Sequence, residues 1–405
     1  MLEKESDKAE FSKALKIGAL CIVTYTASYI MRNVLSVSSV QMLKDGFTKD
    51  KIGSISSIYF MAYAFGQLVN GRLGDKAKAK NMVVTGLFMS GFAAICFLLV
   101  QNLYMQIVVF ALNGFGLSML RGPLVKTISE NTIPKHARNI CIGFSAAGLC
   151  GPLFAGMLAA VLNWRYVFFS SAAITVIMGI LSFAVLSFYE SKGVIADISK
   201  NNKKEKTSYF KMFLIDKFLM YLFVGALTET VSSSVVFWIP AYLAENLGFS
   251  ASQASLIYSV ISVIRSVCPF LCIFIFNLIK NKDRLLIGTL FSAACVFFAL
   301  MNFASNRWVN ISSAVLALVC VGCVSSTLWS FFIPSLGKYG CVSSANGLFD
   351  FAGYIAASAA NMFFATAVTK FGWTRLTYIW SALMLSGVLV VLLCGVLPLK
   401  KVRKV

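Results

Sequence analysis

Twelve apolar stretches, separated by short polar breaks, follow one another along the whole chain. The hydrocarbon core of a bilayer is about 30 Å thick, and about 20 helical residues are needed to cross it. The stretches lie at approximately 14–40, 52–72, 81–100, 103–128, 140–162, 167–189, 218–244, 251–279, 285–302, 309–336, 343–368 and 374–398. Because a segment in lipid must pair its own backbone groups, we predict an all-α integral membrane protein with twelve transmembrane helices.

The composition agrees with this prediction. Hydrophobic residues make up 58% of the 405 residues and charged residues 13%, which excludes a soluble domain of this length. The first stretch is too long for the apolar core of a signal peptide and follows an acid-containing segment, so we expect no cleavage. Cys320 and Cys323 form a C-x-x-C pair with no His or acid at ligand spacing, which favours packing over metal binding. The sequence predicts no metal, no cofactor and no disulfide framework.

One long polar segment divides the chain. It covers residues 191–217, lies between the sixth and seventh apolar stretches, and is rich in lysine. We therefore predict a six-helix bundle over residues 1–190, a cytoplasmic basic linker over 191–217, and a second six-helix bundle over 218–405.

The formal net charge of +20 raises the alternative of a nucleic-acid-binding protein, and the distribution of the charge argues against it. Lys and Arg gather in alternate polar segments, namely the N-terminus, 71–80, 135–138, the linker, 280–284 and the C-terminal tail. By the positive-inside rule these segments are cytoplasmic, which places both termini inside the cell and requires an even number of spans. We expect a multi-pass protein of the inner or plasma membrane whose partner is the lipid bilayer, with no folded domain to bind nucleic acid.

Ionisable residues inside the apolar stretches are the strongest indicators of a functional site. Arg32 lies in the first stretch, with Tyr29 one turn and Tyr25 two turns before it on nearly the same face. A guanidinium fork and phenol hydroxyls together suit an anionic ligand. The alternative is a structural ion pair, but the first stretch contains no acid that could pair with Arg32. We therefore predict that Arg32, Tyr29 and Tyr25 bind a small anion.

Three further charges lie in apolar stretches. Arg121 precedes Gly122 and Pro123 in the fourth stretch, where it either adds positive potential to the site or interacts with the cytoplasmic surface. Glu229 and Arg265 fall near the middle of the seventh and eighth stretches, and we expect them to pair with each other. Such a pair is either a static clamp or a gate that opens when an anion competes for Arg265.

A polar stripe follows the helical period of the eleventh stretch and contains Asn346, Asp350, Tyr354 and Asn361. We predict that Tyr354 contacts the substrate and that Asp350 takes part in coupling or gating. Packing of Asp350 against the end of a neighbouring helix explains this residue equally well.

The loop between the second and third stretches resembles the signature loop of the major facilitator superfamily. Gly71 is followed by Asp75 four residues later, then by Lys76 and by Lys80. In physical terms, we expect the glycine to permit close helix packing, the acid to hold a helix end and the lysines to anchor the loop at the cytoplasmic surface. The resemblance implies two pseudo-symmetric six-helix bundles that work by alternating access around a cavity near the midplane.

A weak internal repeat supports that architecture. Asn163 and Trp164 precede the sixth stretch, and Gly372 and Trp373 precede the twelfth. In both places a helix rich in small residues comes before the turn, so we expect close helix contacts and a Trp anchor at the outer membrane interface.

Further segments carry a second resemblance: Tyr29-Ile30-Met31-Arg32-Asn33, Ala62-Tyr63-Ala64-Phe65-Gly66, Pro123 with Lys126-Thr127, Trp238-Ile239-Pro240-Ala241-Tyr242-Leu243, Gly347-Leu348-Phe349 followed by Ala356-Ala357-Ser358-Ala359, and Phe371-Gly372-Trp373. These segments resemble the organophosphate:phosphate antiporters of the superfamily, which carry glycerol phosphate and sugar phosphates. The resemblance implies that Arg32 binds the substrate phosphate. The family's second phosphate-binding Arg, in the seventh span, falls on Ser232 here. Either Arg121 or Arg265 replaces it, or the substrate carries less charge than a phosphate ester.

Other functions remain open at this level. The first stretch also resembles that of symporters that carry carboxylates such as sugar acids with protons, and Glu229 is then the candidate coupling residue. A transporter-like sugar-phosphate sensor is a second alternative, and drug efflux is a third that the buried cations disfavour. The sequence contains no nucleophile with a base and no phosphate loop, so we predict a transporter and not an enzyme. We expect a functional monomer that takes a small anionic substrate.

Overall fold

The computed structural model describes residues 2–195, 217–268, 271–272, 274–275, 283–304, 306–333, 336 and 342–396. Within these ranges the secondary structure is helical and no β-strand occurs. The first half of the chain forms α1 (Leu2–Lys44), α2 (Lys49–Lys76), α3 (Ala79–Leu99), α4 (Leu103–Ser118), α5 (Arg121–Asn131), α6 (Pro134–Val161) and α7 (Trp164–Ser191). The second half forms α9 (Phe218–Glu229), the π-helix η1 (Thr230–Val235), α10 (Val236–Glu245), α11 (Ala251–Ser266), α13 (Asp283–Leu300), α14 (Arg307–Thr327), the π-helix η2 (Leu328–Phe332) and α16 (Val342–Val396).

Each of the twelve predicted stretches overlaps a described helix. The eleventh and twelfth both fall in α16, which Gly372 breaks with φ 79° and ψ 175°, a left-handed conformation that glycine adopts without strain. In the part of the chain that is described, nine helical segments are long and apolar enough to span a membrane, and one of them is the 50-residue segment Ala345–Cys394. The predicted all-α, multi-pass membrane architecture is confirmed.

The helices group into two compact units. The first contains residues 1–47, 58–203 and 250–263, and the second contains residues 48–57, 204–249 and 264–405. Helix α2 therefore passes from the second unit to the first after Ser57, and α11 passes from the first to the second after Val263. Most of the predicted basic linker, residues 196–216, lies outside the described residues.

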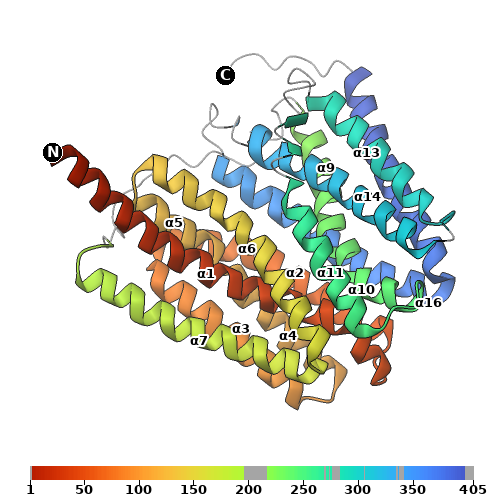
Figure 1. Ribbon diagram of the computed structural model, residues 1–405, viewed down its shortest axis with the longest axis horizontal. Coiled ribbons are helices and arrows are strands. Elements are labelled where there is room, and N and C mark those ends of the chain that lie inside the picture. Colours follow the sequence, from red (N-terminus) through yellow and green to blue (C-terminus); the bar gives the residue numbers. More distant parts are fainter. Residues whose placement is uncertain are drawn as a thin grey trace. The chain divides into compact units, whose positions relative to one another are not determined.

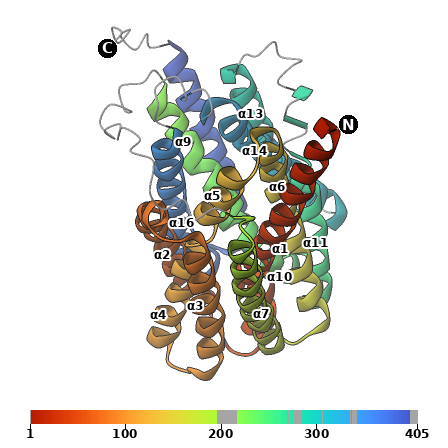
Figure 2. The same ribbon diagram turned by 90° about the vertical axis from the view of Figure 1, so that its left-hand side faces the viewer.

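In the first unit, α1 packs against α6 and α7, and α3 packs against α4 and α7 (Figures 1 and 2). Phe97 of α3 stacks on Phe168 of α7 with ring centroids 4.9 Å apart, and Phe110 of α4 lies 5.4 Å from Phe97. Buried polar pairs join the same helices, such as Ser90 donating to Asn113 at 2.5 Å. Such hydrogen bonds are favourable in lipid because no water is available there to pair with a polar group.

In the second unit, α16 packs against α9, η1 and α13, and α13 also packs against α14. Trp380 is fully buried, with the rings of Phe298 and Phe364 at 5.8 and 6.2 Å. Ser234 of η1 donates to the carbonyl of Ala357 at 2.8 Å and accepts from Asn361 at 3.1 Å. Asn361, which the sequence placed in the polar stripe, therefore holds η1 against α16.

The two tryptophans of the predicted repeat form equivalent hydrogen bonds. Trp164 donates its indole N–H to Asp45, just after α1, at 2.6 Å. Trp373 donates its indole N–H to Glu245, the last residue of α10, at 2.8 Å. Each unit thus contains one tryptophan that ties the start of its last span to the end of its first, which is a repeat of contacts as well as of sequence.

Candidate functional site

Arg32 lies on α1 in the first unit, half-buried among tyrosine rings. Its Cζ lies 5.0 Å from the ring centroid of Tyr63 on α2 and 5.6 Å from that of Tyr29. The ring of Tyr25 meets Tyr29 edge-on at 5.2 Å. The helical spacing of Tyr25, Tyr29 and Arg32 does bring the three together, and the two adjacent ring faces stabilise the positive charge by cation–π attraction.

Tyr59 completes this aromatic wall. Its ring stacks on that of Tyr63 at 6.4 Å, and its side chain is 2% exposed. The Tyr59 hydroxyl is buried without a hydrogen-bond partner among the described residues. A buried hydroxyl without a partner is costly unless a ligand or water uses it. Tyr59 and Tyr63 were not predicted as site residues, although their spacing of four residues on the second stretch was a usable signal.

Arg121 begins α5, directly after the two residues that separate α5 from α4, and its side chain is exposed. Added positive potential at the site and interaction with the cytoplasmic surface both stay predictions for this residue.

A second set of hydrogen bonds supports the turn of α1 that carries Arg32. Tyr258 of α11 donates its hydroxyl hydrogen to Asn33 Oδ1 at 2.6 Å, and Asn33 Nδ2 donates to the carbonyl of Tyr29 at 2.7 Å. Tyr258 is 1% exposed. Sequence reasoning missed Tyr258, because hydropathy does not show which face of an apolar helix meets a neighbour.

In the second unit, Glu229 and Arg265 have serine partners. Arg265 donates from Nη2 to Ser232 Oγ at 3.1 Å, and Glu229 accepts from Ser233. Both serines belong to η1, the π-helical turn that follows Glu229. The expected direct pairing of Glu229 with Arg265 stays a prediction.

The surroundings of Arg265 leave one donor unused. Its Nε is buried and has no hydrogen-bond partner in the described part of the chain. An unsatisfied guanidinium N–H next to a π-helical turn fits a binding site, since π-helical turns are frequent at functional sites. Gly353 permits the close approach of α16 here, because a Cβ at this position would lie 2.8 Å from the Cβ of Glu229.

The remaining predicted residues of the stripe lie on α16. Tyr354 is buried and Asp350 is half-buried, and their roles stay predictions. In the signature loop, the side chains of Asp75 and Lys76 lie outside the described set. Lys80 forms a salt bridge with Glu190 of α7 at 2.5 Å and donates to Ser187 at 3.2 Å, so it ties α3 to the end of α7.

A Cβ at Gly71 would meet no atom of the described residues within 4 Å. The role expected for Gly71 in close helix packing stays a prediction.

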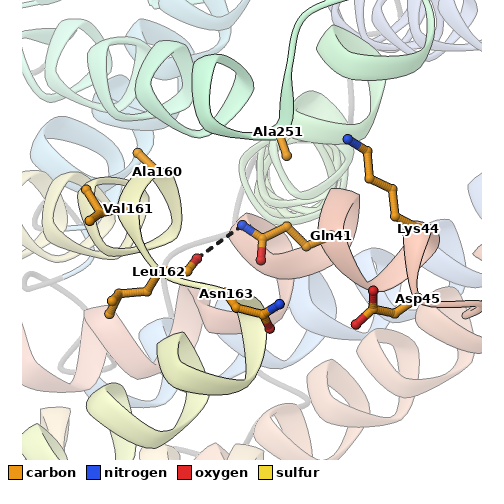
Figure 3. A pocket seen from close by; sticks show the side chains of 8 residues that line it. All are labelled: Gln41, Lys44, Asp45, Ala160, Val161, Leu162, Asn163 and Ala251. Atoms are coloured by element: carbon orange, nitrogen blue, oxygen red, sulfur yellow. Dashed lines mark hydrogen bonds between the residues drawn. The ribbon is translucent and has the colours of Figure 1, made fainter.

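One hollow of about 290 Å³ opens where α1, the turn between α6 and α7, and the start of α11 meet (Figure 3). Its lining residues are Gln41, Lys44, Asp45, Ala160, Val161, Leu162, Asn163 and Ala251. Gln41 donates to the carbonyls of Ala159 and Leu162 at 3.1 Å and accepts from the Trp164 amide at 2.5 Å, so its polar groups are already used. None of the predicted ligand residues lines this hollow.

The family model described as Major Facilitator Superfamily matches residues 21–361. A glycerol-3-phosphate transporter of Bacillus subtilis (strain 168) is 25% identical over 400 residues, with 92% of this chain and 90% of the relative covered. The glucose-6-phosphate exchanger SLC37A2 of Mus musculus is 22% identical over 392 residues, covering 83% and 77%. A hexuronate transporter of Bacillus subtilis (strain 168) is 28% identical over 256 residues, covering 57% and 56%.

A solved structure shares the fold. The nucleoside transporter NupG superposes with a TM-score of 0.74 at 12% sequence identity, covering 94% of this chain and 99% of that one. At this identity the likeness concerns the fold alone.

Proposed function

The chain belongs to the Major Facilitator Superfamily, and from this premise we propose that it is a secondary transporter of a small phosphorylated metabolite. The substrate class is a glycerol phosphate or sugar phosphate, exchanged for inorganic phosphate by alternating access. The observation that carries the proposal is the similarity to a glycerol-3-phosphate transporter over 92% of the chain. The similarity to a glucose-6-phosphate exchanger supports the same substrate class.

Arg32 is the proposed phosphate ligand in the first unit. Its planar fork matches two oxygens of a tetrahedral phosphate, whereas the adjacent ring faces of Tyr29 and Tyr63 hold the cation in place. The Tyr59 hydroxyl offers a further hydrogen bond, and Arg121 raises the local positive potential. Tyr25 completes the predicted contacts.

Arg265 is the proposed anion ligand of the second unit. Arg265 donates to Ser232. In the organophosphate:phosphate antiporters that this chain resembles, the position of Ser232 holds the second phosphate-binding arginine. A guanidinium from α11 therefore replaces one from the seventh span. An anion competes with Ser232 for this guanidinium, and we propose that the exchange of partners is part of the transport cycle. Tyr354 remains a proposed contact, and Glu229 and Asp350 remain proposed coupling or gating residues.

The proposed setting is the cell membrane, with both termini and the linker in the cytoplasm and a single chain as the functional unit. The alternating distribution of Lys and Arg supports this orientation. The two halves, residues 1–190 and 218–405 with the linker 191–217 between them, remain the proposed repeat units.

The test is counterflow into proteoliposomes loaded with inorganic phosphate, with labelled glycerol 3-phosphate or glucose 6-phosphate outside. We expect uptake that needs internal phosphate and that an imposed proton gradient does not change. Binding of the labelled compounds without flux would instead point to a sensor. No binding and no flux for any phosphate ester would reject the proposed substrate class.

A carboxylate symporter is the second candidate, favoured by the similarity to a hexuronate transporter over 57% of the chain. In that case Glu229 carries the coupling proton. The same vesicles distinguish the two functions, because gradient-driven uptake of a labelled hexuronate, with no effect of internal phosphate, is the result that only the symporter gives.

A further inference from the structure

Tyr258 is a buried tyrosine of α11 whose hydroxyl contacts the turn that carries Arg32. The hydroxyl lies 2.6 Å from Asn33 Oδ1, and Asn33 is the residue after Arg32. The phenol is the donor in this bond, because a carboxamide oxygen can only accept.

The orientation of the Asn33 amide follows from this bond. With Oδ1 facing the phenol, Nδ2 faces the carbonyl of Tyr29, to which it donates at 2.7 Å. Tyr29 in turn places its ring 5.6 Å from the Arg32 Cζ. A continuous series of contacts therefore runs from the Tyr258 hydroxyl through Asn33 to the ring that supports Arg32.

The helix that supplies Tyr258 also supplies Arg265. The two residues are seven positions apart on α11, which is two turns and about 10 Å along the helix axis. Tyr258 bonds to the turn that carries Arg32, and Arg265 bonds to Ser232 of η1. One helix thus contacts both of the elements that we propose for anion binding.

We propose that Tyr258 is a positioning residue for Arg32 that acts through Asn33. The proposal rests on the proposed function, in which Arg32 binds the phosphate group. Loss of the phenol hydroxyl lets the Asn33 amide rotate and loosens the turn between Tyr29 and Asn33. Arg32 then samples more conformations before the anion binds, so the affinity falls.

The variant that tests this is Tyr258→Phe, which keeps the ring and removes the hydroxyl. Its phosphate:phosphate exchange should show a half-saturating phosphate concentration about fivefold higher, the effect of one neutral hydrogen bond, with a smaller change in maximal rate. The matched control is Tyr242→Phe, since the Tyr242 hydroxyl donates to Asn310 at 2.7 Å and is equally buried, in the second unit. This control should leave the half-saturating concentration within about twofold of the wild type, the change expected where no ligand contact is altered.

A double-mutant cycle separates positioning from general loosening of the fold. If Tyr258 acts through Asn33, then Asn33→Ala combined with Tyr258→Phe should raise the half-saturating concentration no more than Asn33→Ala does alone. Additive effects would show that the phenol acts by another route and would overturn the proposal. If Tyr258→Phe is not monodisperse, Asn33→Ala alone must still raise the half-saturating concentration, and a wild-type value would overturn the proposal.

The positioning role of Tyr258 and the proposed transport of phosphate can be rejected separately. Wild-type protein that exchanges phosphate, together with an unaffected Tyr258→Phe variant, rejects only the positioning role. Wild-type protein that neither binds nor exchanges phosphate rejects both.

Discussion

Arg32 and Arg265 are both arginines on apolar helices, but their surroundings differ in kind. Arg32 is held by the faces of two tyrosine rings, with ring centroids at 5.0 and 5.6 Å from its Cζ. Arg265 is held by one hydrogen bond of 3.1 Å to Ser232 and has a buried Nε without a partner among the described residues. The contacts described for Arg32 therefore include two aromatic faces, whereas the contact described for Arg265 is a neutral hydrogen bond.

This difference bears on how each arginine meets an anion. A ring face stabilises a guanidinium without accepting any of its N–H bonds, so Arg32 is oriented before the ligand arrives. A serine oxygen takes one of the donors of Arg265, and an anion must displace it. We therefore expect Arg32 to set the affinity and Arg265 to set the ease with which the anion is taken up and released.

Arg32→Lys should have the largest effect. Lysine keeps the charge but loses the bidentate fork and most of the contact with the rings, so phosphate exchange should fall about 100-fold. The measurement is phosphate exchange in proteoliposomes with matched amounts of reconstituted protein. The matched control is Arg165→Lys, because Arg165 also lies over a ring, 5.0 Å from that of Trp164, but outside the proposed site. Exchange by Arg32→Lys at the rate of this control would remove Arg32 from the mechanism.

Arg265→Lys should have a smaller effect. A lysine ammonium can still approach Ser232, but it cannot offer the two parallel donors of a guanidinium, so exchange should fall about tenfold. The two arginine variants are compared in one preparation, with monodisperse protein confirmed for each. Equal losses of exchange at the two positions would contradict the expectation that Arg32 sets the affinity and Arg265 sets the ease of uptake and release.

Ser232→Ala should act in the opposite direction. Removing the oxygen that competes for Arg265 should lower the half-saturating phosphate concentration by about two- to fivefold and slow the maximal rate, because release becomes harder. The control is Ser262→Ala on α11, whose hydroxyl donates to the carbonyl of Tyr258 at 2.9 Å. A raised half-saturating concentration in Ser232→Ala would mean that the serine positions Arg265 and does not compete with the anion.

The two regions also differ in how far the sequence predicts them. The spacing of Tyr25, Tyr29 and Arg32 lies within one helix, so the helical period alone brings them together. The expected Glu229 to Arg265 pair spans two helices, and the serines that these two side chains contact lie in a π-helical turn of six residues. A single extra residue per turn is not visible in hydropathy, so the sequence offers no signal for it.

The other features of the fold also differ in how well the sequence predicts them. The twelve spans follow from the length of the apolar stretches, and Gly372 marks the break in α16 because its φ of 79° suits glycine. Tyr258 bonding to Asn33 and Asn361 bonding to Ser234 depend on the rotation of each helix about its axis. Lipid-facing and protein-facing surfaces are both apolar in a membrane protein, so periodicity determines that rotation poorly.

Glu229→Gln, in the second unit, should have the smallest effect on exchange. Glutamine keeps an oxygen that can accept from Ser233, so the contact with η1 survives while the negative charge is lost. Arg265 donates to Ser232 in the structure, and we expect this contact to survive in the variant, so phosphate exchange should stay within about twofold of the wild type, a change too small for loss of a direct charge pair. A large loss of phosphate exchange would show that Glu229 pairs with Arg265 at another stage of the cycle. Gradient-driven uptake of a hexuronate that disappears in Glu229→Gln would instead identify this carboxylate as the coupling group of a symporter.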